Sequence, residues 1–157
     1  VSGGAAVVRG RGEQIEPLPA GPELWLVIVK PQISVSTAWA YGAIDSMPDR
    51  VSHRMTGKMA EALKEGEARR IVSSQCNDFE AALFPEMPAL AWLHDELIMA
   101  GAAAAHVCGS GAALYGMAES EAAAHKIAAQ FQGRYPFVSV ARTAPRQARF
   151  SSDGEGR

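Results

Sequence analysis

The chain has 157 residues, of which 48% are hydrophobic and 20% are charged, and its formal net charge is −2 at pH 7. This length suits one domain with a sizeable core. No cluster of Lys and Arg marks a face for nucleic acid or for an anionic membrane, so we expect neither as a partner. The uncharged window 97–118 is interrupted by glycine, histidine and serine, which argues against a membrane span.

Cysteine and histidine show no motif in this sequence. Cys76 and Cys108 are the two cysteines, and a secreted disulfide scaffold would have more of them. We therefore expect a cytoplasmic protein. The four histidines are not close to one another or to cysteine along the chain, so we expect structural or surface roles for them and predict no metal site.

Residues 1–18 predict a β-hairpin. VSGGAAVV is typical of a strand, a charged turn follows at 10–13, and 15–18 supplies the returning strand. Because the chain begins within a strand and not with methionine, we expect that it is cut from something longer. The partner strands of this hairpin would then lie in the absent part.

The apolar run LWLVIV at 24–29 ends at Lys30-Pro31 and is typical of a strand covered on both faces. Ser34 and Ser36 can then cap a short helix over 37–45. In that helix Thr37 and Tyr41 are four residues apart and share one face. Judged by pattern alone, Tyr41 is a half-buried core aromatic.

Three further helices follow from apolar spacing. The first ends at Gly66 and has an apolar stripe, rich in methionine, that favours a core role. The stripe consists of Val51, Met55, Met59, Ala62 and Leu63. Asn77 and Glu80 resemble a capping box that begins the second. Pro88 suits the first turn of the third, which ends at Gly101 and buries Leu90, Leu93 and Leu97.

The stretch 103–118 consists of two uncharged runs on either side of Gly109, Ser110 and Gly111. We predict strands at 103–107 and 112–117. Glycine amides can approach a bound anion or sugar closely. A Gly-Ser-Gly tripeptide alone nevertheless favours an ordinary tight turn, and no GK[ST] follows that would make it a Walker A loop.

The end of the chain completes the fold prediction. Ser120 caps a helix that ends before Gly133, and 137–141 supplies a last strand. The order strand, helices, strand, strand, helix, strand is that of an α+β, ferredoxin-like split βαβ domain, which we assign to 23–143. Residues 144–157 are polar and aperiodic, and we expect a flexible tail there.

Four segments carry a family resemblance: SGGAAVVRGRGE at 2–13, KPQISVSTAWAYGAID at 30–45, NDFE at 77–80 and CGSGAALYG at 108–116. Together they resemble the C-terminal part of the GHMP small-molecule kinases, which include galactokinase, homoserine kinase and mevalonate kinase. Within that group they are most similar to the kinases that act on 4-diphosphocytidyl-2-C-methyl-D-erythritol. The resemblance covers nearly the whole chain.

The resemblance implies a kinase that uses ATP and Mg²⁺ to phosphorylate a hydroxyl of a cytidine-diphosphate-linked methylerythritol, in the non-mevalonate route to isoprenoid precursors. It implies that Tyr41 stacks on the cytosine and that Thr37 lies near the substrate. Aromatic stacking on a base contributes about 1–3 kcal/mol, which suits that role. Gly109, Ser110 and Gly111 match the family's third motif, which supports substrate and phosphate positioning.

The family's other motifs are missing from this sequence. Its phosphate-binding glycine loop, its catalytic lysine and the aspartate of its G-A-D-V-P motif belong to an N-terminal domain. The resemblance therefore implies no catalytic residue in this chain, and we expect the chain alone to be inactive. Residues 1–20 would be remnant strands of that N-terminal kinase domain, which becomes a required partner.

Two other functions stay open. One is another GHMP kinase, such as a homoserine kinase, for which a base-stacking ring at Tyr41 would serve no purpose. The other is a non-catalytic ferredoxin-like module that binds a small metabolite or mediates assembly.

Overall fold

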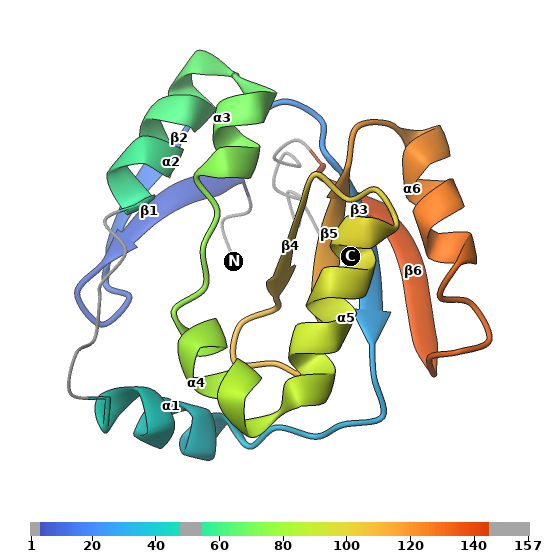
Figure 1. The fold of residues 1–157 in the computed structure, drawn as a ribbon. Coiled ribbons are helices and arrows are strands. Elements are labelled where there is room, and N and C mark those ends of the chain that lie inside the picture. Colours follow the sequence, from blue (N-terminus) through green and yellow to red (C-terminus); the bar gives the residue numbers. More distant parts are fainter. Residues whose placement is uncertain (1–3, 48–54, 145–157) are drawn as a thin grey trace, which may run out of the picture.

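The computed structural model describes residues 4–47 and 55–144. Figure 1 shows its elements, which are β1 (Ala5–Arg9), β2 (Gln14–Leu18), β3 (Trp25–Lys30), α1 (Thr37–Asp45), α2 (Met55–Glu65), α3 (Ala68–Ser73), α4 (Phe79–Glu86), α5 (Pro88–Met99), β4 (Ala104–Val107), β5 (Leu114–Ala118), α6 (Glu121–Ala129) and β6 (Phe137–Arg142). The start predicted for α2 at Val51 and nearly all of the predicted tail lie outside the described residues. The short helix α3 was not predicted.

The hairpin predicted at the start of the chain is present. β1 and β2 pair antiparallel, from Ala5 opposite Leu18 to Arg9 opposite Gln14, and form a sheet of their own. Gly10, at φ 65°, makes the left-handed turn between them that glycine adopts easily. Val8 and Ile15 are more than half exposed, so the hairpin presents apolar side chains to solvent.

The main sheet has four strands in the order β4-β5-β3-β6, and every pair of neighbours is antiparallel. Counted by their order in the chain, these four strands are arranged 2-3-1-4. This is the ferredoxin-like arrangement, so the predicted fold class is confirmed. Figure 1 shows α5 and α6 packed together against one face of the sheet.

The core lies between that face and the two helices. Val27 and Val29 of β3 are fully buried there, together with Leu90, Leu93 and Leu97 of α5, Ile127 of α6 and Phe131 just after α6. Leu26 and Ile28, which alternate with them and point to the opposite face, are only partly buried. The predicted covering on both faces is therefore complete on one face and partial on the other.

Two predicted serine caps are confirmed. Ser36 Oγ accepts a hydrogen bond from Trp39 N at 3.4 Å at the start of α1. Ser120 Oγ accepts one from Ala123 N at 3.1 Å at the start of α6. Each hydroxyl satisfies a backbone donor of the first helical turn that has no partner within the helix.

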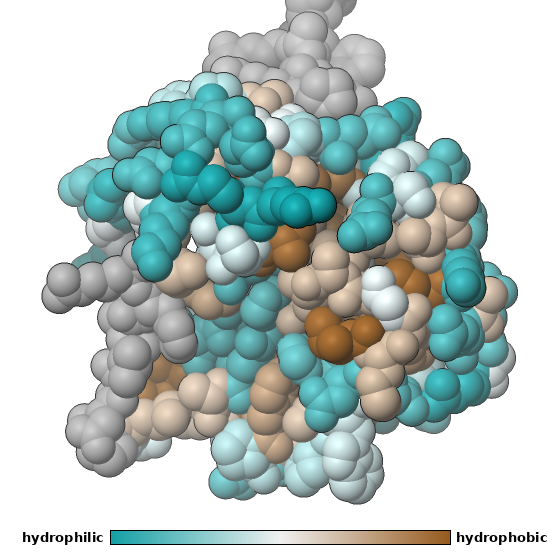
Figure 2. Space-filling model, turned by 45° about the horizontal axis from the view of Figure 1, so that its top comes forward, coloured by the Kyte–Doolittle hydropathy of each residue, from teal (hydrophilic) through white to brown (hydrophobic). Residues whose placement is uncertain are grey.

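Within the described residues, no helix is both long enough and apolar enough to cross a membrane. Figure 2 shows hydrophobic side chains in separate small areas on the face it presents, with hydrophilic side chains between them. A monomer commonly has such scattered apolar surface.

Candidate functional site

The glycine turn, residues 108–111, connects β4 to β5. Gly111 N donates to Cys108 O at 3.0 Å, and Cys108 N donates to Ala113 O at 2.8 Å. Gly109 and Gly111 have φ values of 55° and 92°, in the left-handed region that favours glycine. The predicted turn is therefore present, although β5 begins at Leu114, two residues later than expected.

The two glycines have different surroundings. A Cβ added at Gly109 would meet nothing within 4 Å, so this residue faces open space. A Cβ at Gly111 would lie 3.4 Å from Val35 and 3.5 Å from Leu83 and Val107, against the core. Gly109 thus belongs to the surface of the site, and Gly111 to the packing beneath it.

Backbone donors remain free in this turn. Among the hydrogen bonds of the described residues, none uses the N–H of Gly109 or of Ser110. Backbone N–H groups in a tight turn with left-handed residues can bind an anion such as a phosphate oxygen. The turn can therefore accept a negatively charged group from solvent.

A side-chain hydrogen bond joins α1 to the glycine turn. Thr37 Oγ1 lies 3.1 Å from Ser110 Oγ, across a sequence separation of 73 residues. Thr37 is the first residue of α1 and follows the cap residue Ser36, so its hydroxyl is held at the helix N-terminus. Two of the predicted substrate-binding segments are thus brought into direct contact.

Tyr41 lies one helical turn beyond Thr37. Its side chain is 57% exposed, so the assignment made from pattern alone, a half-buried core aromatic, is wrong. Its ring packs edge-to-face with the Phe79 ring, with centroids 5.0 Å apart and an interplanar angle of 89°. That contact holds the tyrosine ring while much of its surface stays open to a ligand.

The residues at the start of α4 were misassigned from sequence. Asp78, and not Asn77, is the N-cap of α4, and Glu80 does not reach back to it. Instead, Glu80 Oε1 accepts a hydrogen bond from Val107 N at 2.7 Å, and His106 Nδ1 lies 3.2 Å from both carboxylate oxygens. The capping-box prediction is wrong because a strand distant in sequence provides the partner of Glu80.

Asn77 contacts the glycine turn directly. Its Nδ2 donates to Val107 O and to Gly109 O, both at 2.8 Å, and its Oδ1 accepts from Phe79 N at 3.0 Å. Sequence reasoning missed this role. The only signal was the presence of NDFE among the segments that resemble the kinase family.

The two thiols beside this region are not activated. Burial raises the pKa of Cys108, and burial followed by the charges of Asp78 and Glu80 raises that of Cys76. A thiol with a raised pKa stays protonated at neutral pH and is a poor nucleophile. The chemistry of the site therefore rests on binding groups, and not on cysteine.

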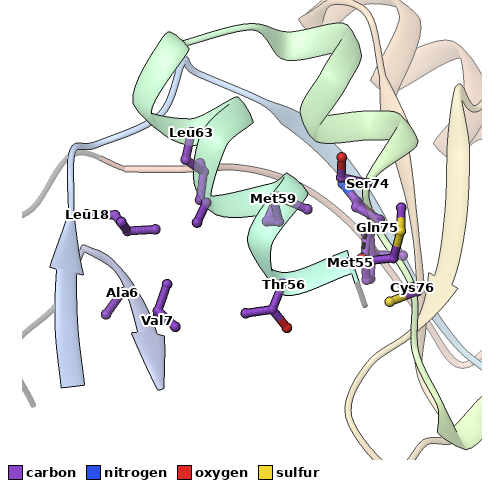
Figure 3. A pocket seen from close by; sticks show the side chains of 12 residues that line it. Ala6, Val7, Leu18, Met55, Thr56, Met59, Leu63, Ser74, Gln75 and Cys76 are labelled. Atoms are coloured by element: carbon purple, nitrogen blue, oxygen red, sulfur yellow. Dashed lines mark hydrogen bonds between the residues drawn. The ribbon is translucent and has the colours of Figure 1, made fainter. Parts of the chain in front are cut away.

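A separate hollow of about 270 Å³ lies between the β1–β2 hairpin and α2. Figure 3 shows Met59 and Leu63 of α2 on one side, with Val7 and Leu18 of the hairpin opposite. Met55, Met59 and Leu63 of the predicted stripe are partly buried and line this hollow, whereas Ala62 is fully buried, so the predicted core role holds only in part. None of the predicted substrate-binding residues lines this hollow.

Four of the five predicted residues lie along α1 and the glycine turn, which the hydrogen bond between Thr37 and Ser110 connects, while Gly111 packs beneath them. They offer an exposed aromatic ring, two hydroxyls and two backbone N–H groups, which are groups suited to a planar base and an anion. Between 4–47 and 55–144, no three His, Cys, Asp or Glu side chains are grouped to hold a metal ion.

Comparison with known proteins agrees with the fold. The family model described as GHMP kinases C terminal matches residues 59–136. A 4-diphosphocytidyl-2-C-methyl-D-erythritol kinase of Moorella thermoacetica is 39% identical over 148 residues, which cover 91% of this chain and 51% of the relative. The chain belongs to the GHMP kinases and contains their C-terminal region.

Solved structures give the same picture. The crystal structure of a 4-(cytidine 5'-diphospho)-2C-methyl-D-erythritol kinase superposes with a TM-score of 0.68 at 26% identity, covering 87% of this chain and 48% of that one. A homoserine kinase from Cytophaga hutchinsonii has a TM-score of 0.71 at 22% identity, covering 93% and 50%, and shares the fold. The chain spans about half the length of the relatives it matches.

Proposed function

We propose that this chain is the C-terminal part of an ATP-dependent kinase that phosphorylates a hydroxyl of 4-diphosphocytidyl-2-C-methyl-D-erythritol. The observation that carries the proposal is the hydrogen bond between Thr37 and Ser110. It joins the helix that presents the exposed Tyr41 ring to a turn with free backbone donors. The similarity to kinases of this name, at 39% identity to the Moorella thermoacetica enzyme, supports the same substrate.

Each predicted residue has a role that suits a cytidine-diphosphate-linked ligand. Tyr41 stacks on the cytosine ring, since every base offers a flat π-face to an aromatic side chain. The N–H groups of Gly109 and Ser110 donate to phosphate oxygens. Thr37 and Ser110 offer hydroxyls between these two sites, where they can bind the polar groups that link base and phosphate.

ATP with Mg²⁺ supplies the phosphoryl group in such a reaction. The bond between the γ-phosphorus and its bridging oxygen breaks, a bond to the acceptor oxygen forms, and the hydroxyl proton passes to a base. The family resemblance assigns that base and the main phosphate-binding loop to the N-terminal half of the enzyme. In this proposal the present chain orients the acceptor substrate, and holding the reactants together provides much of the rate.

Steady-state kinetics test this proposal on the upstream-extended protein, by which we mean this chain extended in frame before Val1 to about the length of its relatives. ADP release is measured with ATP, Mg²⁺ and either the cytidyl substrate or homoserine. We expect turnover with the cytidyl substrate alone. Turnover with homoserine alone would support the other kinase class. Binding of CDP without turnover of either substrate would support a metabolite-binding module.

A further inference from the structure

Asn77 uses its whole side-chain amide to hold the glycine turn. Both Nδ2 hydrogens are donated to backbone carbonyls, at Val107 and Gly109, and Oδ1 accepts the N–H of Phe79. These bonds are 2.8–3.0 Å long, which is normal for N–H···O geometry. The side chain therefore links the start of α4 to carbonyls on both sides of Cys108.

The same short segment also contacts the rest of the site. Glu80 accepts the N–H of Val107, so both backbone polar groups of Val107 bond to side chains of α4 or its N-terminal flank. Phe79, between Asn77 and Glu80, packs against the Tyr41 ring. Residues 77–80 thus touch both the phosphate-binding turn and the base-binding ring.

The turn depends on this support because it has few internal contacts. Within the described residues, its own backbone hydrogen bonds are the one from Gly111 N to Cys108 O, inside the turn, and the one from Cys108 N to Ala113 O, at its base. The Gly109 carbonyl bonds to Asn77, while the space beside Gly109 is open. Removing the amide leaves two carbonyls without their partner and lets Gly109, whose backbone is intrinsically flexible, take other conformations.

We propose that Asn77 is a positioning residue, which orients the free N–H groups of the glycine turn for phosphoryl transfer without touching the substrate. The kinetic part of this proposal rests on the proposed function. Orientation of donors toward developing charge acts mainly on kcat, whereas the contact between Phe79 and Tyr41 acts on binding of the base. Asn77 and Phe79 are two residues apart and joined by a hydrogen bond, but replacing each of them should change different kinetic constants.

The first test uses Asn77→Ala and Asn77→Asp in the upstream-extended protein. Both should lower kcat about 10- to 100-fold while KM for the cytidyl substrate changes less than about twofold. The aspartate variant keeps the shape and the acceptor for Phe79 N but loses both donors, so it should not rescue kcat. Phe79→Leu should instead raise KM and leave kcat nearly unchanged.

Gln130→Ala is the matched control. Gln130 Nε2 also donates to two backbone carbonyls, those of Ala100 and Lys126 at 3.4 Å, but it lies at the end of α6 and outside the site. Its loss should leave kcat and KM unchanged. A fall of kcat in Gln130→Ala that matches the fall in Asn77→Ala would overturn the proposal, because the effect would then be general destabilisation.

A second measurement does not depend on activity. Amide hydrogen exchange of residues 109–111, measured on the 157-residue chain without ligand, should become faster in Asn77→Ala and stay unchanged in Gln130→Ala. Unchanged exchange in Asn77→Ala would refute the positioning role even if the kinase assignment holds. If the unmodified extended protein does not phosphorylate the cytidyl substrate, the proposed function fails and exchange alone decides the role of Asn77.

Discussion

Replacement of Tyr41 by alanine tests the base-binding site most directly. The ring is 57% exposed, and its one aromatic contact among the described residues is the edge-to-face pair with Phe79. Such a pair contributes about 0.5–1.5 kcal/mol, so the loss of folding stability should be of that order. Stacking on a base contributes about 1–3 kcal/mol, which corresponds to a loss of affinity of roughly 5- to 150-fold.

The two effects are separated by assay. KM for the cytidyl substrate and KM for ATP are measured in the upstream-extended protein, together with urea unfolding of the same variants. Tyr41→Ala should raise KM for the cytidyl substrate and leave KM for ATP nearly unchanged. Tyr41→Phe should be mild, because the ring remains and no hydrogen bond within the described residues uses the hydroxyl.

Trp92→Ala provides a control for the loss of an exposed ring. Trp92 is 68% exposed on α5, and within the described residues no hydrogen bond or ring contact links it to α1 or to the glycine turn. Its replacement should not change either KM. An equal rise of both KM values in Tyr41→Ala, or no change at all, would show that the ring does not stack on the base.

Three further predictions concern the turn, the sheet and the chain itself. Gly111→Ala should lower the free energy of unfolding by about 1–2 kcal/mol, because alanine resists the left-handed φ of Gly111. Gly109→Asn should be nearly neutral, because asparagine tolerates this φ and the space beside Gly109 is open. Urea unfolding of both variants checks this. Burial raises the pKa of Tyr115 to about 12 from 10.0, so its contribution to the free energy of unfolding is complete below pH 10 and is lost as the pH rises toward 12. Tyr115→Phe should remove this part of the pH dependence of the free energy of unfolding. An unchanged pH dependence in that variant would contradict the prediction. The 157 residues alone should release no ADP with ATP, Mg²⁺ and the cytidyl substrate, and a rate like that of the upstream-extended protein would contradict the assignment of catalysis to the N-terminal half.

Local rules explain why so much of the fold could be predicted. The apolar run at 24–29 becomes β3, and the hydroxyls of Ser36 and Ser120 cap the helices that follow them. These signals depend on neighbours within about four residues, which the sequence displays directly. The helix α3 escaped prediction because its six residues are too short for a clear apolar period.

Side chains whose partners lie far along the chain could not be assigned in this way. Glu80 and Asn77 looked like a local capping box. Asn77 Oδ1 does accept the N–H of nearby Phe79, but the amide donors of Asn77 and the carboxylate of Glu80 bond to the backbone of Val107 and Gly109, about thirty residues away. Tyr41 looked like a core residue because helical spacing shows which face it shares and not what covers that face. The methionines of α2 likewise line a hollow whose other wall is the hairpin.

The roles assigned to Thr37, Tyr41 and the glycine turn came from family motifs, and they stay predictions. By itself, the sequence determined the order of the elements apart from α3, two of the helix caps and the GHMP kinase resemblance, since each depends on short contiguous patterns. Only the tertiary structure decided that Thr37 meets Ser110, that Tyr41 stays exposed and that residues 77–80 support both. The physical reason is that sheet pairing brings β4 and its turn beside α4 and α1, and this long-range geometry selects which polar groups become partners.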